Sequence, residues 1–190
     1  MRKIVFDIET ANLIPSVRAD ASDLELALVG IHDSETDTYS SYTKDELPNL
    51  WPILERADLL IGFNSDAFDI PLLNRYYPGD LTAIQSLDIL KEVYQTLGRR
   101  LRLDTLARAT LGRGKIGDGT KSVDWWQQGL VEKVREYCIE DVRLTKELYD
   151  FARANNYLKY KDLNEIREIK LDTSSWENRG KTSLTYTLPF

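Results

Sequence analysis

The distribution of apolar and polar residues predicts a chain in which strands and helices alternate. Apolar residues cluster in RKIVFDIET at 2–10, alternate with polar ones through two segments that a short polar turn separates, and form a compact run in DLLIGF. Such segments of four to ten residues, bounded by turn residues, are typical of strands. Five strands are predicted, at 2–10, 23–33, 36–44, 58–63 and 81–89, and the second and third of them should pair as a hairpin.

Segments with helical periodicity lie between and after these strands. Helices are predicted over 46–57, 64–77, 89–96, 103–111 and about 130–154. Pro71 falls in the first turns of the second helix, where it is tolerated. We therefore expect a three-layer α/β fold, with a mixed five-stranded central sheet flanked by helices, in a domain that spans 1–155. The remainder, 156–190, is predicted to be a terminal hairpin or an extended tail, which either covers a sheet edge, mediates self-association or is partly disordered.

Two pairs of residues carry the first signs of chemistry. Asp7 and Glu9 occupy alternate positions of the first predicted strand, so their side chains project from the same face. Tyr137 and Asp141 are four residues apart on the long predicted helix, which places them one turn apart on one face. Asp69 follows the buried strand at 58–63. Carboxylates in such apolar surroundings are costly to bury unless a cation offsets their charge.

Each of these residues also has an ordinary structural interpretation. An Asp at the end of a strand is often a turn or cap residue, as Asp7 would then be. Asp69 would be favoured at a helix N-terminus by the helix dipole, and Tyr137 would be a half-buried helix aromatic. Ordinary structural roles would have to account separately for three acidic segments in this order along the chain. One metal site explains all three together. Oxygen ligands suit hard cations, which favours Mg²⁺ or Mn²⁺ over Zn²⁺.

The three segments together resemble the motifs of the DnaQ-like, or DEDD, exonuclease superfamily. The runs are FDIET, GFNSDAFDIPLL and YCIEDVRLT, and LLIGFNSDAFDIPLL is especially similar to the exonuclease domains of family B DNA polymerases and their standalone relatives. The third motif of that superfamily carries either His or Tyr ahead of its Asp. Here Tyr137 fits the tyrosine spacing, and Glu136 stands where the histidine type would place its His. The resemblance therefore indicates the tyrosine (DEDDy) subtype, over residues 2 to about 151.

This resemblance implies a ribonuclease H-like fold and a metal-dependent 3′-5′ exonuclease that uses two divalent cations, Mg²⁺ or Mn²⁺. It implies that Asp7 bridges both cations, that Glu9 and Asp141 complete the site of the cation that activates water, and that Asp69 holds the other largely through waters. It also implies that Tyr137 orients the attacking water. A catalytically inactive nucleic-acid or protein-binding module on the same fold is the alternative, but such a copy would be expected to have lost a carboxylate.

Contacts to the substrate are predicted at five positions. Thr10 and Asn64 follow strands that carry or precede the acidic residues, and Phe68 would stack on a base or pack in the core. The net charge is −6, yet between Lys91 and Lys121 eight basic residues face three acidic ones. Within this basic region, Lys115 and Lys121 lie in a Gly-rich stretch. We expect this stretch to be a loop that closes over the end of the nucleic-acid strand.

Several other reactive side chains receive no role in this interpretation. His32 is expected to be a surface or turn residue, Cys138 a packed core thiol, and Glu140 to point away from the acidic residues. Asp88 matches a position that is often acidic in the relatives that this chain resembles. Its spacing alone does not show whether it reaches a metal ion.

The expected substrates and partners follow from the same motifs. We expect the 3′ ends of single-stranded or frayed DNA or RNA, DNA being favoured, as substrates. A polymerase or helicase is a possible partner in trans. With no apolar leader and no long apolar span, the chain is expected to be soluble, cytoplasmic and without a membrane partner.

Overall fold

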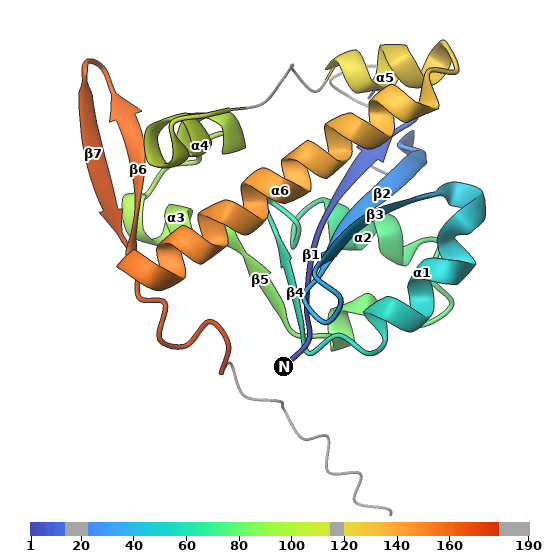
Figure 1. Cartoon of the computed structure of the whole chain (residues 1–190), viewed down its shortest axis with the longest axis horizontal. Helices are drawn as coiled ribbons and strands as arrows, with labels where there is room; N and C mark the ends of the chain where they lie inside the picture. The colour runs from blue at the N-terminus through green and yellow to red at the C-terminus, as the bar shows by residue number, and fades with distance from the viewer. Residues whose placement is uncertain (14–22, 115–119, 179–190) are drawn as a thin grey trace, which may run out of the picture.

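A five-stranded sheet forms the centre of the molecule (Figure 1). The computed structural model describes residues 1–13, 23–114 and 120–178. The strand order is β3-β2-β1-β4-β5. The strands are β1 (Lys3–Thr10), β2 (Leu26–Asp33), β3 (Thr38–Thr43), β4 (Leu59–Gly62) and β5 (Ser86–Asp88). All five lie within or close to the segments that the sequence predicts, although β5 is much shorter because Leu81–Ala83 forms a separate 3-10 turn, η3.

The pairing of these strands makes the sheet mixed, as predicted. β1 pairs antiparallel with β2, and β2 pairs antiparallel with β3. On its other side β1 pairs parallel with β4, which pairs parallel with β5. Because β1 is central and β4 is parallel to it, residues that follow the carboxyl end of β4 are brought beside β1.

Helices cover both faces of this sheet. They are α1 (Leu47–Leu54), which follows the 3-10 turn η2 (Lys44–Glu46), α2 (Asp69–Asn74), α3 (Ile89–Leu97), α4 (Leu103–Leu111), α5 (Thr120–Gln127) and α6 (Val131–Asn155). One apolar cluster joins Ile4, Phe6 and Ile8 of β1 to α1 and α2. The other joins Val5 to α3, α4 and α6. The alternation along β1 therefore separates two cores, and the three-layer α/β prediction is confirmed.

The segment after α6 turns back onto the second core. β6 (Tyr157–Asp162) and β7 (Glu165–Lys170) form an antiparallel hairpin, and β6 packs against α4. The hairpin is one of the two structures that the sequence leaves open for this region. Leu158, Tyr160 and Ile169 share an apolar cluster with α3, α4 and α6. The proposed division into 1–155 and 156–190 stays a prediction, but the two parts have this cluster in common.

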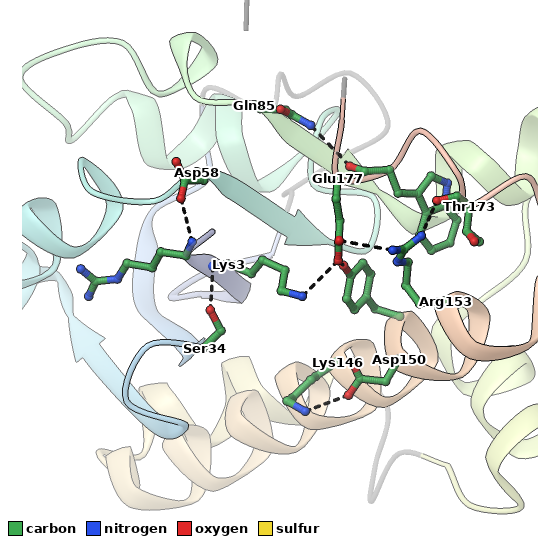
Figure 2. Close-up of polar contacts among 12 residues, drawn as sticks. Lys3, Ser34, Asp58, Gln85, Lys146, Asp150, Arg153, Thr173 and Glu177 are labelled. Carbon is green, nitrogen blue, oxygen red and sulfur yellow. Dashed lines mark hydrogen bonds and ion pairs between the residues drawn. The ribbon is translucent and has the colours of Figure 1, made fainter. Parts of the chain in front are cut away.

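Residues 171–178 are held to the body of the protein by both packing and polar contacts (Figure 2). Trp176 is fully buried, stacks on Tyr149 of α6, and donates from Nε1 to Glu92 Oε2 at 3.1 Å. Glu177 accepts from Lys3 Nζ at 3.1 Å and pairs with Arg153 at 3.3 Å (Figure 2). Trp176, an isolated aromatic in the sequence, is therefore a core residue.

His32 differs from its expected place at the surface. It is only 2% exposed, lies on the face of β2 that α6 covers, and contacts Asp37 from Nε2 at 2.9 Å. The sequence interpretation was wrong because α6 crosses this end of β2, which nothing local to His32 indicates. None of the helices in the described ranges combines the length and apolar character that crossing a membrane requires.

Candidate active site

Asp7 and Glu9 face α6 from β1, as their spacing predicts. Glu9 is 7% exposed, whereas Asp7 is partly buried. Ile8 between them packs on the opposite face with α1 and α2. The pairing of β1 with β2 shifts register between Glu9 and Thr10, so a bulge-like irregularity follows the second carboxylate directly. Such irregularities redirect side chains at the end of a strand. The end of β1 therefore presents two neighbouring carboxylates to the helix above it.

Asp69 joins this pair through the backbone of β1. The parallel pairing of β1 with β4 ends at Val5 and Ile61, because β4 stops at Gly62. Beyond that point the Ile8 N–H donates to Asp69 Oδ1 at 3.2 Å. Asp69 is 4% exposed and is the first residue of α2. The Asp69 carboxylate therefore bonds to the edge of β1 beyond the end of β4, at Ile8, which lies between Asp7 and Glu9 in the sequence.

Three residues of α6 complete the group. Tyr137, Cys138 and Asp141 are all buried. The Cys138 thiol lies 3.4 Å from the carbonyl oxygen of Asp7 and 3.7 Å from Asp7 Oδ2. Burial first, and then the charges of Asp7, Glu9 and Asp141, hold the pKa of this thiol well above its ordinary value. The thiol is therefore protonated and donates to Asp7, and the same three carboxylates surround it.

Cys138 is the residue at this site that sequence reasoning missed. Ligand atoms of Asp7, Glu9 and Cys138 lie within 4.8 Å of one another, and among the described residues neither Asp69 nor Asp141 belongs to this closest group. Its position directly after Tyr137 was the available signal. A residue one place along a helix points about 100° away from its neighbour, so only the packing of α6 on the sheet shows that both reach the site.

Gly30 allows α6 to approach the sheet at this point. Gly30 is the β2 partner of Asp7. A Cβ atom built on it would lie 2.8 Å from Cys138 Sγ and 3.2 Å from Val142 Cγ2. Glycine is therefore needed for close helix-to-sheet contact here, and its effect is to bring Tyr137 and Asp141 down to the level of Asp7.

The N-terminal half of α6 is also tied to the edge of the sheet. Arg135 donates to the carbonyl oxygen and the hydroxyl of Ser41, both at 2.9 Å, and to Glu46 Oε2 at 2.8 Å. The same carboxylate accepts from the Thr43 N–H at 2.8 Å. The Thr43 N–H and then Arg135 lower the pKa of Glu46 to about 2. This network lies two residues before Tyr137 and so holds the start of the site helix.

Acid should weaken this anchor in a defined range. Because the folded-state pKa of Glu46 is about 2 and its ordinary value is 4.5, its ionisation stabilises the fold above about pH 4.5. That contribution is lost as pH falls towards about 2. We expect Glu46→Gln to lower the urea midpoint at pH 7, and the difference from wild type to shrink below pH 4.5. A matched Glu136→Gln change on exposed α6 surface, outside this network, should have little effect. A difference that stays constant down to acid pH would contradict this assignment.

The loop before Asp69 is organised by Asp88, which explains a residue that the sequence left without a role. Its carboxylate accepts from the backbone N–H groups of Asn64 and Asp66 at 2.8 and 3.2 Å, and from those of Leu90 and Lys91 at 2.9 and 3.3 Å. Burial raises the pKa of Asp88, and these hydrogen bonds oppose that rise. Asp88 thus caps α3 and shapes the loop that leads to Asp69.

This loop also corrects the predicted helix over 64–77. The helix observed, α2, begins only at Asp69, and Asn64 has a left-handed backbone with φ of 69°. Asn tolerates this conformation better than most residues, and no helix passes through it. The Phe68 N–H donates to the Asn64 carbonyl oxygen at 3.1 Å, so the loop is a compact turn.

The predicted substrate contacts have different surroundings. Thr10 ends β1 beside Glu9, and Phe68 is half-buried against the core that contains α1 and α2. Lys121 is exposed on the helix α5, not in a loop as the sequence suggested. Lys115 lies outside the described residues.

Most described cations of the predicted basic region are already paired with carboxylates. Arg99 pairs with Asp162, Arg108 with Asp104, and Lys91 with Asp66. Arg113 contacts Glu140 and Glu147. Glu140 therefore points away from the site, as expected. The positive charge counted in the sequence is largely offset in the fold.

The donor set of the site fits a divalent cation. Glu9, Asp69 and Asp141 are nearly inaccessible to solvent, and ligand atoms of Asp7 and Glu9 lie within 4.8 Å of each other. Tyr137 packs edge to face on Trp125 at 6.0 Å. Gathering so much negative charge in a poorly solvated place favours an ion that carries two positive charges. The carboxylate oxygens are hard ligands, so they suit Mg²⁺ or Mn²⁺.

Comparison with known proteins agrees with the fold. A family model of the RNase H superfamily matches residues 4–153. DNA polymerase 1 of Aeropyrum pernix is 28% identical over 149 residues, which cover 63% of this chain and 15% of the polymerase. The family B DNA polymerase of Pyrobaculum calidifontis superposes with a TM-score of 0.63 and 17% identity, over 80% of this chain and 24% of that one. The chain is thus similar to a small part of each polymerase, and it belongs to the RNase H superfamily.

Proposed function

We propose that this protein is a 3′-5′ exonuclease that removes nucleotides from single-stranded or frayed nucleic acid, DNA being favoured, with two divalent cations. Membership of a superfamily of nucleases supports hydrolysis of phosphodiester bonds. The observation that carries the proposal is the convergence of four carboxylates from three elements: Asp7 and Glu9 from β1, Asp69 from α2 and Asp141 from α6. Cations held by these carboxylates would activate a water, so the proposed reaction needs no nucleophile from the protein.

The residues have separate tasks in this proposal. Asp7, Glu9, Asp69 and Asp141 would hold Mg²⁺ or Mn²⁺. The bound cations would lower the pKa of a water and offset negative charge on the phosphate. Asp7 is fixed by the Cys138 thiol, and Asp69 by the Ile8 N–H, so the carboxylates are oriented before substrate binds. Tyr137 enters from α6 beside Asp141 and would orient the attacking water.

The direct test uses end-labelled oligonucleotides. Single-stranded DNA and RNA carrying a 5′ label should be shortened one nucleotide at a time with Mg²⁺ or Mn²⁺, and chelator should stop the reaction. Release of internal fragments only would indicate an endonuclease and reject the proposal. Binding without any cleavage would favour an inactive binding module on this fold. A polymerase or helicase partner and a cytoplasmic location stay predictions from the sequence.

Tyr137→Phe should reduce the rate only in part. The phenol orients water while the carboxylates stay in place, so we expect kcat to fall about tenfold, equivalent to about 1.4 kcal/mol, with KM unchanged. Tyr149→Phe on the same helix is the matched control and should leave kcat unchanged, because Tyr149 contacts Glu177 and Trp176 instead. A loss in Tyr137→Phe as complete as that from removing Asp7 would show that the hydroxyl does more than orient water.

A further inference from the structure

A second pocket opens beside the loop that carries Asp69. Its volume is about 250 Å³, and it is lined by the loop after β4, the first turns of α3 and the segment between α3 and α4. The residues that decide its chemistry are Asn64, Asp66, Asp88, Lys91, Tyr94 and Arg100. It adjoins the carboxylate site because Asn64 and Asp69 belong to one turn, closed by the bond from Phe68 N–H to the Asn64 carbonyl oxygen at 3.1 Å.

The acidic groups of this pocket already have hydrogen-bonding partners. Asp88 accepts four backbone N–H groups. Asp66 accepts from the Ser86 hydroxyl at 2.6 Å and from Lys91 Nζ at 2.7 Å. Both carboxylates therefore already accept hydrogen bonds from other groups, and Asp66 is also paired with a cation.

Arg100 carries the positive charge that remains. Its guanidinium is exposed and donates to the amide oxygen of Asn64, which is a neutral partner. Arg99, its neighbour in sequence, instead pairs with Asp162 and lies 5.0 Å from the ring centroid of Tyr160 on the hairpin. The structure thus separates two arginines that the sequence could not distinguish. Of the two described cations that line the pocket, Lys91 is paired with Asp66, so Arg100 is the one available to an anion.

Tyr94 adds an aromatic surface next to this cation. It is 51% exposed, which is unusual for a large apolar side chain, and it lies on α3 one turn beyond Lys91. An exposed ring beside an arginine is the combination by which proteins bind single-stranded nucleic acid, through stacking on a base and contact with a phosphate.

We propose that this pocket is a subsite for a nucleotide that lies on the 5′ side of the terminal nucleotide, with Arg100 contacting its phosphate and Tyr94 stacking on its base. The inference rests on the proposed function, because it assumes a strand whose 3′ end lies at the carboxylates. Arg100 and Asn64 then link the pocket to the turn that positions Asp69. Substrates long enough to occupy both places should bind more tightly than a dinucleotide.

Binding of oligonucleotides without hydrolysis tests this subsite. Fluorescein-labelled dinucleotide and octanucleotide of deoxythymidine, with phosphorothioate linkages that resist hydrolysis, would be titrated with the full chain in Mg²⁺ at low salt, with anisotropy as the readout. For Arg100→Ala we expect about a tenfold weaker affinity for the octanucleotide, no change for the dinucleotide, and a salt dependence whose log-log slope is smaller by about 0.7. Tyr94→Ala should also weaken octanucleotide binding about tenfold, but with the slope unchanged, and Tyr94→Phe should bind as wild type does.

Arg56→Ala provides the matched control. Arg56 is an exposed arginine after α1 that contacts the Pro52 carbonyl oxygen, and its loss should leave both affinities unchanged. Equal losses for dinucleotide and octanucleotide in Arg100→Ala, or no loss for either, would overturn the subsite. So would failure of the wild-type chain to bind the octanucleotide more tightly than the dinucleotide. Because the assay requires no cleavage, an inactive chain that shows the expected binding pattern would refute the exonuclease and keep the subsite.

Discussion

Replacing Asp7 by alanine is expected to abolish nucleotide release with either Mg²⁺ or Mn²⁺. The Asp7 carboxylate lies close to residues of both β1 and α6. Glu9 neighbours it on β1, and the Cys138 thiol of α6 lies 3.7 Å from its Oδ2. Removing a charged group that holds a cation costs several kcal/mol of transition-state stabilisation, so we expect a loss of at least about 10³-fold in kcat/KM. Asp141→Ala should have the same result.

The folded state should survive these two changes. Each removes one member of a cluster of like charges, so in chelator the variants should melt at the wild-type temperature or above it. The stabilisation that wild type gains from added Mn²⁺ should in turn be lost, which calorimetry would show. Glu168→Ala is the control, because its carboxylate is exposed on β7, away from the site. Wild-type cleavage by either Asp7→Ala or Asp141→Ala would remove these residues from the active site.

Gly30→Ala should also reduce activity strongly, although residue 30 carries no functional group. The new methyl group would lie 2.8 Å from Cys138 Sγ and 3.2 Å from Val142 Cγ2, so α6 must move away from β2. Tyr137 and Asp141 would move with it. A displacement of about 1 Å at a reacting centre costs about 10²-fold in rate, and overpacking costs about 1–3 kcal/mol of stability. Activity on labelled oligonucleotides and urea unfolding would measure the two effects.

A double variant separates this steric cause from other effects of the substitution. Cys138→Ala removes the sulfur that the new methyl group would meet, so Gly30→Ala with Cys138→Ala should be more stable than Gly30→Ala alone. Stability is the readout, because the same thiol donates to Asp7. Additive losses in the double variant would mean that contact with Cys138 is not the cause. Wild-type stability and activity in Gly30→Ala would show that α6 does not need its close approach to the sheet.

Local periodicity was sufficient to predict most of the central layer. Alternation in β1 places Asp7 and Glu9 opposite Ile8, and the structure agrees because both sides of the strand are covered by apolar cores. The spacing of Tyr137 and Asp141 likewise predicts a shared helix face, on which both are buried. These predictions succeed because the periods of a strand and of a helix are local properties of the backbone.

Several failures concern contacts between distant parts of the chain. His32 looks like the end of a strand until α6 covers it, and Trp176 looks isolated until it stacks on Tyr149. The predicted helix over 64–77 fails because Asp88, from β5, holds the preceding loop in a turn. Arg99 and Arg100 cannot be told apart by position, yet one meets Asp162 and the other Asn64.

The amino-acid sequence by itself determined the order of strands and helices, the acidic motifs and the tyrosine that accompanies the last of them. These are properties of residue type and spacing, which the backbone geometry translates directly into faces and turns. Only the tertiary structure decided that Asp69 takes the place of a strand partner at Ile8, that Gly30 lets the Cys138 thiol reach Asp7, and which cations remain unpaired. Those outcomes depend on packing between elements, because burial and pairing are set by neighbours that are remote in the chain.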